Sequence, residues 1–147
     1  MKDTEKQLRH IAIIPDGSRR WAKKHGLLSW QGHIKAADNV VHIIKAAFNM
    51  GIPYLTIWGG SYDNLTKRSR EEINKLEEVY RALAQRVLND PEIKEKGVRV
   101  RVLGEWPDIL TRETIEVLRE AEEGTKDLNL NNLTLLIGYN GDREMVS

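Results

Sequence analysis

One short segment near the N-terminus combines a lone carboxylate, a turn glycine and a group of cations. Asp16 ends an apolar run and Gly17 follows it. Residues 16–35 contain five lysines and arginines and one carboxylate, a local balance of 5 − 1 = +4 in a chain of net charge +1. Glycine lets the backbone approach a ligand closely, and Mg²⁺ commonly takes one or two carboxylates together with phosphate oxygens. The segment therefore predicts a site for a diphosphate and Mg²⁺. Its cations are Arg19, Arg20, Lys23, Lys24 and Lys35.

Other interpretations of this segment can be weighed from its spacing. A phosphoryl-transfer nucleophile of the Asp-x-Asp type would need a second carboxylate at position 18, which is Ser18. A Walker A loop or a dinucleotide fingerprint would need glycine spacings that are absent from the sequence. A structural alternative stays open, in which Asp16 caps the following helix and the cations form a solvated face.

Further polar residues stand where they could join such a site. His33 follows Gly32, and a lone histidine of this kind is more often structural than catalytic. Ser61, Asp63 and Asn64 follow a predicted strand, where they could cap a helix, bind a substrate or move a proton. The sequence alone leaves both interpretations of these residues open.

Apolar patterning predicts the elements that must position these residues. Strand-like and helix-like segments alternate along the chain, which predicts one α/β domain with a mostly parallel sheet and helices on both faces. The first strand is a continuous apolar run and is expected to be buried on both faces, whereas residues 98–103 alternate valine with arginine, which favours a place near an edge. The expected strands are 11–14, 54–58, 98–103 and 133–137, and the expected helices are 35–50, 69–88 (opened by the capping-box pattern Ser69 to Glu72) and 111–123.

The strand ends predict where a site would lie. Ligands of parallel sheets bind beyond the carboxyl ends of the strands, which share one edge. Three of these ends carry polar or glycine-rich residues, in the loops 15–20, 59–64 and 138–141. We therefore expect the three loops to converge on one rim.

Composition limits the classes of function. The net charge of +1 gives no general attraction to nucleic acid, so no nucleic-acid partner is expected. The absence of cysteine excludes disulfides and thiolate chemistry and fits a cytoplasmic setting. The N-terminal residues are polar, without the apolar core of a signal peptide, and no apolar run is long enough to span a bilayer.

Three motifs, in order, resemble those of the cis-prenyltransferases, the undecaprenyl diphosphate synthase family. The first is HIAIIPDGSRRWAKK at residues 10–24, followed by Gly32 and His33. The second is GIPYLTIWGGSYDN at residues 51–64, and a weaker third is GYNG at 138–141 with REMV at 143–146. The resemblance runs over essentially the whole chain.

The resemblance implies a parallel sheet with flanking helices and a hydrophobic tunnel for a growing chain. It also implies a Mg²⁺-dependent condensation of isopentenyl diphosphate with an allylic prenyl diphosphate to give a polyprenyl diphosphate. By position, Asp16 would hold Mg²⁺ on the allylic diphosphate, and Asn64 would serve in proton removal. The implied substrate-binding positions are Gly17, Ser18, Arg19, Arg20, Trp21, His33, Ser61 and Lys67.

Several positions depart from the family pattern. Ser18 stands where the family usually has asparagine, and Arg19 where it has glycine. An arginine that follows the second motif aligns with Lys67, with Arg68 adjacent. An aromatic residue is replaced by Leu65, and the family's arginine between Trp21 and His33 falls on Ser29.

The family pattern also continues beyond Ser147. There it carries an arginine-rich motif for isopentenyl diphosphate, a second metal carboxylate and much of a dimer interface. Residues 1–147 are therefore expected to be the N-terminal, allylic-diphosphate-binding part of a cis-prenyltransferase domain. The alternative is a non-catalytic or incomplete partner subunit of a two-component enzyme. Either way we expect a homodimer or heteromer, with peripheral membrane contact through a lipid product.

Overall fold

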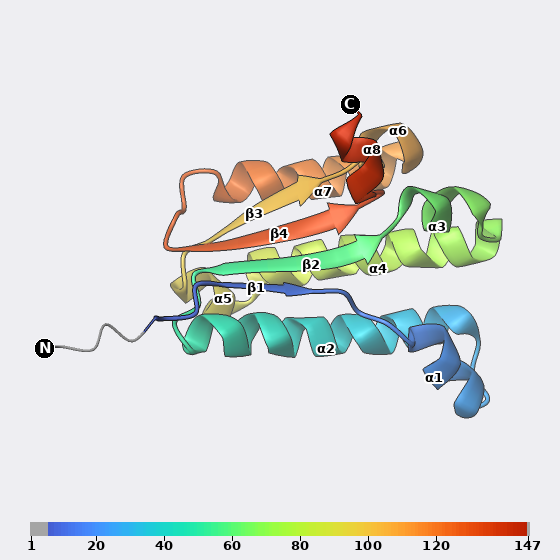
Figure 1. The fold of residues 1–147 in the computed structure, drawn as a ribbon, viewed down its shortest axis with the longest axis horizontal. Helices are drawn as coiled ribbons and strands as arrows, with labels where there is room; N and C mark the ends of the chain where they lie inside the picture. Colours follow the sequence, from blue (N-terminus) through green and yellow to red (C-terminus); the bar gives the residue numbers. More distant parts are fainter. Residues whose placement is uncertain (1–5, 147) are drawn as a thin grey trace, which may run out of the picture.

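Four parallel strands form one sheet within residues 6–146, which are the residues that the computed structural model describes (Figure 1). The strands are β1 (His10–Ile13), β2 (Tyr54–Gly60), β3 (Val98–Leu103) and β4 (Asn131–Ile137), in the spatial order β1-β2-β4-β3. Both pairings of β2 and the pairing of β3 with β4 are parallel. The prediction of an α/β domain with a parallel sheet is confirmed.

The two edge strands differ from each other in how well the sequence predicted them. β3 lies at one edge and alternates buried valines with more exposed residues, as expected. β1 lies at the other edge, where its residues alternate between exposed and half-buried, and Ile14 just after it is 71% exposed. The expectation that β1 is buried on both faces is therefore wrong, because an apolar run alone does not distinguish a central strand from an edge strand.

Eight helices connect and flank these strands in the described part of the chain. None of them combines the length and apolar composition needed to cross a membrane. The second begins at Ser29 rather than at the expected Lys35, because its first turns are capped by the Gln31 side chain, which accepts a hydrogen bond from the Leu28 N–H at 2.8 Å. The helices are α1 (Ser18–Lys24), α2 (Ser29–Asn49), α3 (Tyr62–Lys67), α4 (Arg70–Asn89), α5 (Pro91–Glu95), α6 (Trp106–Ile109), α7 (Arg112–Thr125) and α8 (Gly141–Met145).

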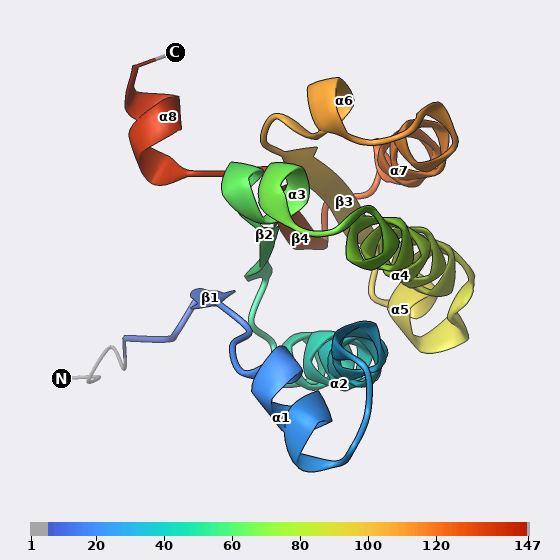
Figure 2. The ribbon, with the colours of Figure 1, turned by 90° about the vertical axis from the view of Figure 1, so that its right-hand side faces the viewer.

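The three longest helices share one face of the sheet. α4 packs between α2 and α7, and α7 packs on β3. Alternate strand residues, among them Leu55, Val100 and Leu133, are almost fully buried beneath this layer and lie side by side in the strand register. On the opposite side, among residues 6–146, Figure 2 shows only the short α8 over the sheet, near its carboxyl end. The residues that point to that side are more exposed, as at Tyr54 and Leu103.

The loops after β1, β2 and β4 lie at one end of the sheet, as the polar strand ends predicted (Figure 1). Backbone and side-chain hydrogen bonds join two of them directly: the Gly138 N–H donates to the Gly60 carbonyl at 2.9 Å, and the Tyr62 N–H donates to Asn140 Oδ1 at 2.9 Å. The loop after β1 meets the loop after β2 across a cavity, described next.

Candidate diphosphate and prenyl-chain site

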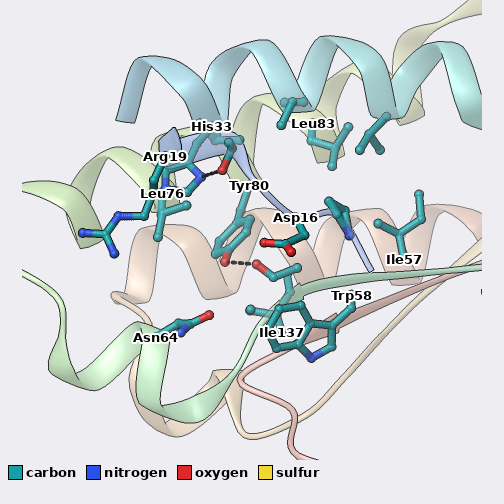
Figure 3. Close-up of a pocket in the computed structure, with 18 of the residues that line it drawn as sticks. Asp16, Arg19, His33, Ile57, Trp58, Asn64, Leu76, Tyr80, Leu83 and Ile137 are labelled. Carbon is teal, nitrogen blue, oxygen red and sulfur yellow. Dashed lines mark hydrogen bonds between the residues drawn. The ribbon is translucent and has the colours of Figure 1, made fainter. Parts of the chain in front are cut away.

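A cavity of about 530 Å³ opens at the carboxyl end of the sheet and runs between α2, α4 and the strands β2 and β4. Its mouth is polar, and its interior is apolar. Arg19 and Asn64 lie toward one end in Figure 3, and Leu83 and Ile57 lie toward the other. A cavity of this kind suits a ligand with an anionic head and a long apolar tail.

The mouth depends on a close approach between α1 and α2. Gly17 takes a left-handed conformation (φ +89°) that glycine adopts without strain, and α1 begins directly after it. Gly32 lies in α2 where the Ser18 backbone crosses it, and a Cβ there would stand 2.1 Å from the Ser18 carbonyl oxygen. Glycine at position 32 therefore allows Ser18 to reach His33.

His33 connects the two helices of the mouth to α4. Its Nδ1 lies 3.1 Å from Ser18 Oγ, and its Nε2 lies 3.2 Å from Glu72 Oε1. Burial lowers the pKa of the His33 imidazole, an effect that Arg68 and Arg19 reinforce and that Glu72 opposes. A neutral imidazole that donates to Glu72 can accept a hydrogen bond from the Ser18 hydroxyl.

Cations gather behind and beside this histidine. Arg19 Nε and Arg68 Nη1 lie 3.3 and 3.4 Å from the same Glu72 oxygen that His33 contacts. Arg68 and His33 are mostly buried, whereas the Arg19 side chain is about half exposed. All three line the cavity, so they present positive charge and hydrogen-bond donors to whatever occupies its mouth.

Asp16 stands on the open side of the mouth. Its carboxylate pairs with Arg20 Nη2 at 3.2 Å, and both side chains are largely exposed. An exposed pair of this kind contributes little to stability, so both groups remain available to a ligand.

The interior of the cavity is formed by side chains of two helices and two strands. Leu76 and Leu83 of α4 and Ile57 of β2 are buried and line it. Tyr80 is also buried here and donates its hydroxyl to the Gly59 carbonyl at 2.7 Å (Figure 3), and burial raises the pKa of its hydroxyl well above the usual value. Its polar atom is thereby satisfied, and the interior presents mainly apolar surface.

The family model of the undecaprenyl diphosphate synthases matches residues 14–147. The chain belongs to this family. It is 34% identical over 138 residues to the tritrans,polycis-undecaprenyl-diphosphate synthase (geranylgeranyl-diphosphate specific) of Pyrococcus horikoshii, covering 94% of this chain and 52% of that protein. It is 35% identical over 138 residues to isoprenyl transferase 2 of Corynebacterium glutamicum, covering 94% of this chain and 55% of that protein.

A solved structure shares both fold and sequence with the chain. The lavandulyl diphosphate synthase of Lavandula x intermedia, in complex with dimethylallyl diphosphate, superposes with a TM-score of 0.83 at 27% identity, over 94% of this chain and 58% of that one. The chain thus spans about half the length of the curated relatives named above.

Most of the predicted site residues surround one cavity. Asp16, Gly17, Ser18, Arg19, Arg20, His33 and Asn64 all line it. Trp21 lies instead in an adjoining hollow that shares Asp16, Gly17 and Ser18, and its ring stacks on His25. Ser61 caps α3 by accepting the Asn64 N–H at 3.0 Å and lines a hollow on the opposite face of the sheet.

The structure distinguishes two neighbouring cations that the sequence could not. Lys67, at the position aligned with the family's arginine, is mostly exposed, pairs with Asp63 at 3.4 Å and is not among the residues that line the cavity. Arg68 lines the cavity instead and pairs with Glu72. The sequence showed only that the two cations are adjacent. Neighbouring side chains point in different directions from the backbone, so adjacency does not tell which of the two faces the cavity.

The site offers Mg²⁺ a single protein carboxylate. Among residues 6–146 no group of three or more histidine, aspartate or glutamate side chains is arranged to hold a metal ion. Asp16 offers one exposed carboxylate beside the cations of the mouth. A hard cation that takes one protein carboxylate, with phosphate oxygens and water as its other ligands, suits that arrangement.

Proposed function

We propose that this chain is the allylic-diphosphate-binding part of a cis-prenyltransferase that condenses isopentenyl diphosphate with an allylic prenyl diphosphate. The observation that carries the proposal is the cavity itself, whose cationic mouth and apolar interior match the two ends of a prenyl diphosphate. The relatives' names, which include undecaprenyl-diphosphate synthase and isoprenyl transferase, support the same reaction class.

The mouth would stabilise the leaving group. In the condensation, the bond between the allylic carbon and its diphosphate breaks, a carbon–carbon bond to isopentenyl diphosphate forms, and a proton is lost. Arg19, Arg20 and Arg68 line the cavity, and their charges would balance the negative charge that grows on the departing diphosphate. Mg²⁺ held by Asp16 would supply further positive charge there when bound.

Asn64 is the residue that we assign to the proton's path. It lies at the cavity mouth across from Arg19 (Figure 3), and its backbone is fixed by the Ser61 cap. Because a neutral amide is a weak base, Asn64 would orient the group that loses the proton rather than keep the proton itself.

The apolar interior would hold the prenyl chain. The apolar side chains of Leu76, Leu83 and Ile57 line the cavity between α2, α4 and the sheet. Burying an apolar chain there is favourable in proportion to the area removed from water.

The face of the sheet opposite α2, α4 and α7, where the short α8 is the one helix among the described residues, supports the alternative in which a partner completes the enzyme. Parallel sheets are almost always covered on both faces, whereas here Tyr54 and Leu103 on the face opposite α2, α4 and α7 are 44% and 50% exposed. We propose that a second prenyltransferase polypeptide, identical or different, covers the exposed part of this face. A long lipid product would then bring the assembly to a membrane surface.

The test supplies Mg²⁺, farnesyl or geranylgeranyl diphosphate and labelled isopentenyl diphosphate, to the chain alone and to the chain with a full-length prenyltransferase partner. A longer labelled product from the chain alone would refute the partner-subunit alternative. Product that forms only with the partner, and is lost when this chain carries Asp16→Asn, would support it. No binding of any allylic diphosphate in either setting would refute the proposed function.

A further inference from the structure

Glu72 is a buried carboxylate with an unusual set of neighbours. It is 8% exposed, and its Oε1 lies within 3.2 to 3.4 Å of Arg19 Nε, His33 Nε2 and Arg68 Nη1. These three groups come from α1, α2 and the turn before α4, so one oxygen connects three parts of the cavity wall. Glu72 itself is not among the residues that line the cavity.

The position of Glu72 in its helix offers its carboxylate a more common use. Ser69 caps α4 and its Oγ accepts the Glu72 N–H at 3.2 Å, which is one half of a capping box. In the other half the glutamate side chain would turn back to the N-cap backbone. Here its Oε1 instead faces the two arginines and the histidine.

The electrostatic consequence concerns any anion that enters the mouth. A carboxylate behind Arg19 and Arg68 neutralises part of their charge and repels a diphosphate held on their far side. If that carboxylate were removed, Arg19 and Arg68 would repel each other, because neither side chain is fully exposed to water. An anion bound at the mouth would then relieve this repulsion.

We propose that Glu72 is a resident counter-anion of the diphosphate site, which balances Arg19 and Arg68 in the absence of ligand and thereby limits the affinity for diphosphate. This inference rests on the proposed function, because it takes the ligand of the mouth to be a diphosphate. A limited affinity suits a site that must release a diphosphate product in every turnover.

Glu72→Gln is the deciding variant, since it removes the charge while nearly keeping the shape. We expect it to lower the thermal stability of the ligand-free chain and to tighten the dissociation constant of inorganic pyrophosphate, measured by calorimetry with Mg²⁺, by about fivefold or more. Glu72→Asp, which keeps the charge, is expected to bind pyrophosphate within about threefold of the unaltered chain. Unchanged or weaker binding by Glu72→Gln would overturn the inference.

Glu77→Gln is the matched control on the same helix. Glu77 is 3% exposed, and its Oε1 accepts hydrogen bonds from the N–H and the hydroxyl of Thr111, both at 2.8 Å, with no cation of the mouth in contact. We expect this variant to lose stability without any change in pyrophosphate affinity. If it tightens binding as much as Glu72→Gln does, the effect is not specific to the mouth and the inference fails.

Two further outcomes keep the test decisive. If Glu72→Gln is unfolded without ligand, its folding is followed against pyrophosphate concentration: refolding supports the inference, and a chain that stays unfolded at saturating pyrophosphate overturns it. If the unaltered chain binds neither pyrophosphate nor an allylic diphosphate, the proposed function fails first. Binding by the unaltered chain with no gain in Glu72→Gln refutes the role of Glu72 alone.

Discussion

Arg68 and Lys67 are adjacent cations with opposite surroundings, so substituting each by glutamine tests which one belongs to the proposed diphosphate site. Arg68 lines the cavity, its side chain is 21% exposed and it pairs with Glu72 at 3.4 Å. Lys67 is 74% exposed and pairs with Asp63. Both substitutions remove one positive charge from the same turn, so the net change in charge is matched.

The expected magnitude follows from the surroundings of Arg68. Two unit charges about 4 Å apart attract by about 4 kcal/mol at an effective dielectric constant of about 20. Part of this is already balanced by Glu72, so we expect a net loss of about 2 kcal/mol, in the range of a single charged hydrogen bond. Arg68→Gln should therefore weaken pyrophosphate binding about 30-fold. Lys67→Gln should weaken it by less than about threefold, because exposed charges are screened.

Calorimetric titration of Mg²⁺ pyrophosphate into the two variants measures this difference. Thermal unfolding serves as the control for folding, and neither variant should lose more than about 1 kcal/mol of unfolding free energy, since Glu72 keeps Arg19 and His33 as partners. An equal loss of affinity in both variants, or a larger loss in Lys67→Gln, would refute the assignment of Arg68 to the mouth.

Three more predictions concern the same mouth. Gly32→Ala should displace the Ser18 backbone, since a Cβ at position 32 would stand 2.1 Å from the Ser18 carbonyl oxygen. We expect this variant to lose about 2 kcal/mol of unfolding free energy and to bind pyrophosphate at least tenfold more weakly. Gly141→Ala, where a Cβ would meet nothing within 4 Å, should change neither the unfolding free energy nor the binding. The pKa of His33 is lowered in the folded chain, so the unfolded chain takes up the proton first as the pH falls. The free energy of unfolding should therefore decrease as the pH drops below about 6.5. The urea midpoint of His33→Gln should depend less on pH in that window. Asp16→Asn should abolish the gain in pyrophosphate affinity that Mg²⁺ provides in the unaltered chain while leaving binding without Mg²⁺ equal or tighter; an undiminished Mg²⁺ effect would exclude Asp16 as the metal ligand.

Patterning of apolar residues was sufficient for the core of the fold. Apolar periodicity and flanking turn residues predict the central strands β2 and β4 and the helices α4 and α7. In each of these elements, burial sets which positions are apolar, and the spacing of those positions distinguishes a strand from a helix. The short helices α3, α5, α6 and α8 were not predicted, since four to six residues carry too little periodicity to mark a helix. The edge position of β1 was missed because pairing with a neighbour, rather than composition, sets whether an apolar strand is enclosed.

The candidate site divides along a similar line. Residues placed by backbone geometry were predictable: Asp16 and Asn64 follow strands whose carboxyl ends meet at one rim. Residues placed by side-chain direction were not. Ser61 follows β2 more directly than Asn64 does, but its hydroxyl accepts the Asn64 N–H, and the residue lines the hollow on the opposite face of the sheet.

Glu72 shows most clearly why such a residue is hidden in the sequence. Ser-x-x-Glu before an amphipathic helix has a sufficient local explanation as a capping box, so nothing in the pattern calls for a second function. Ser69 does cap the helix as the pattern predicts. The Glu72 carboxylate, however, faces Arg19, His33 and Arg68, which precede it in the chain by 53, 39 and 4 residues. The crossing of α1 over α2 at Gly32 brings Arg19 within reach of α4, and the packing of α2 against α4 does the same for His33. The charge balance at the mouth, and with it the diphosphate affinity that we propose for it, is therefore a property of how three helices pack rather than of any one motif.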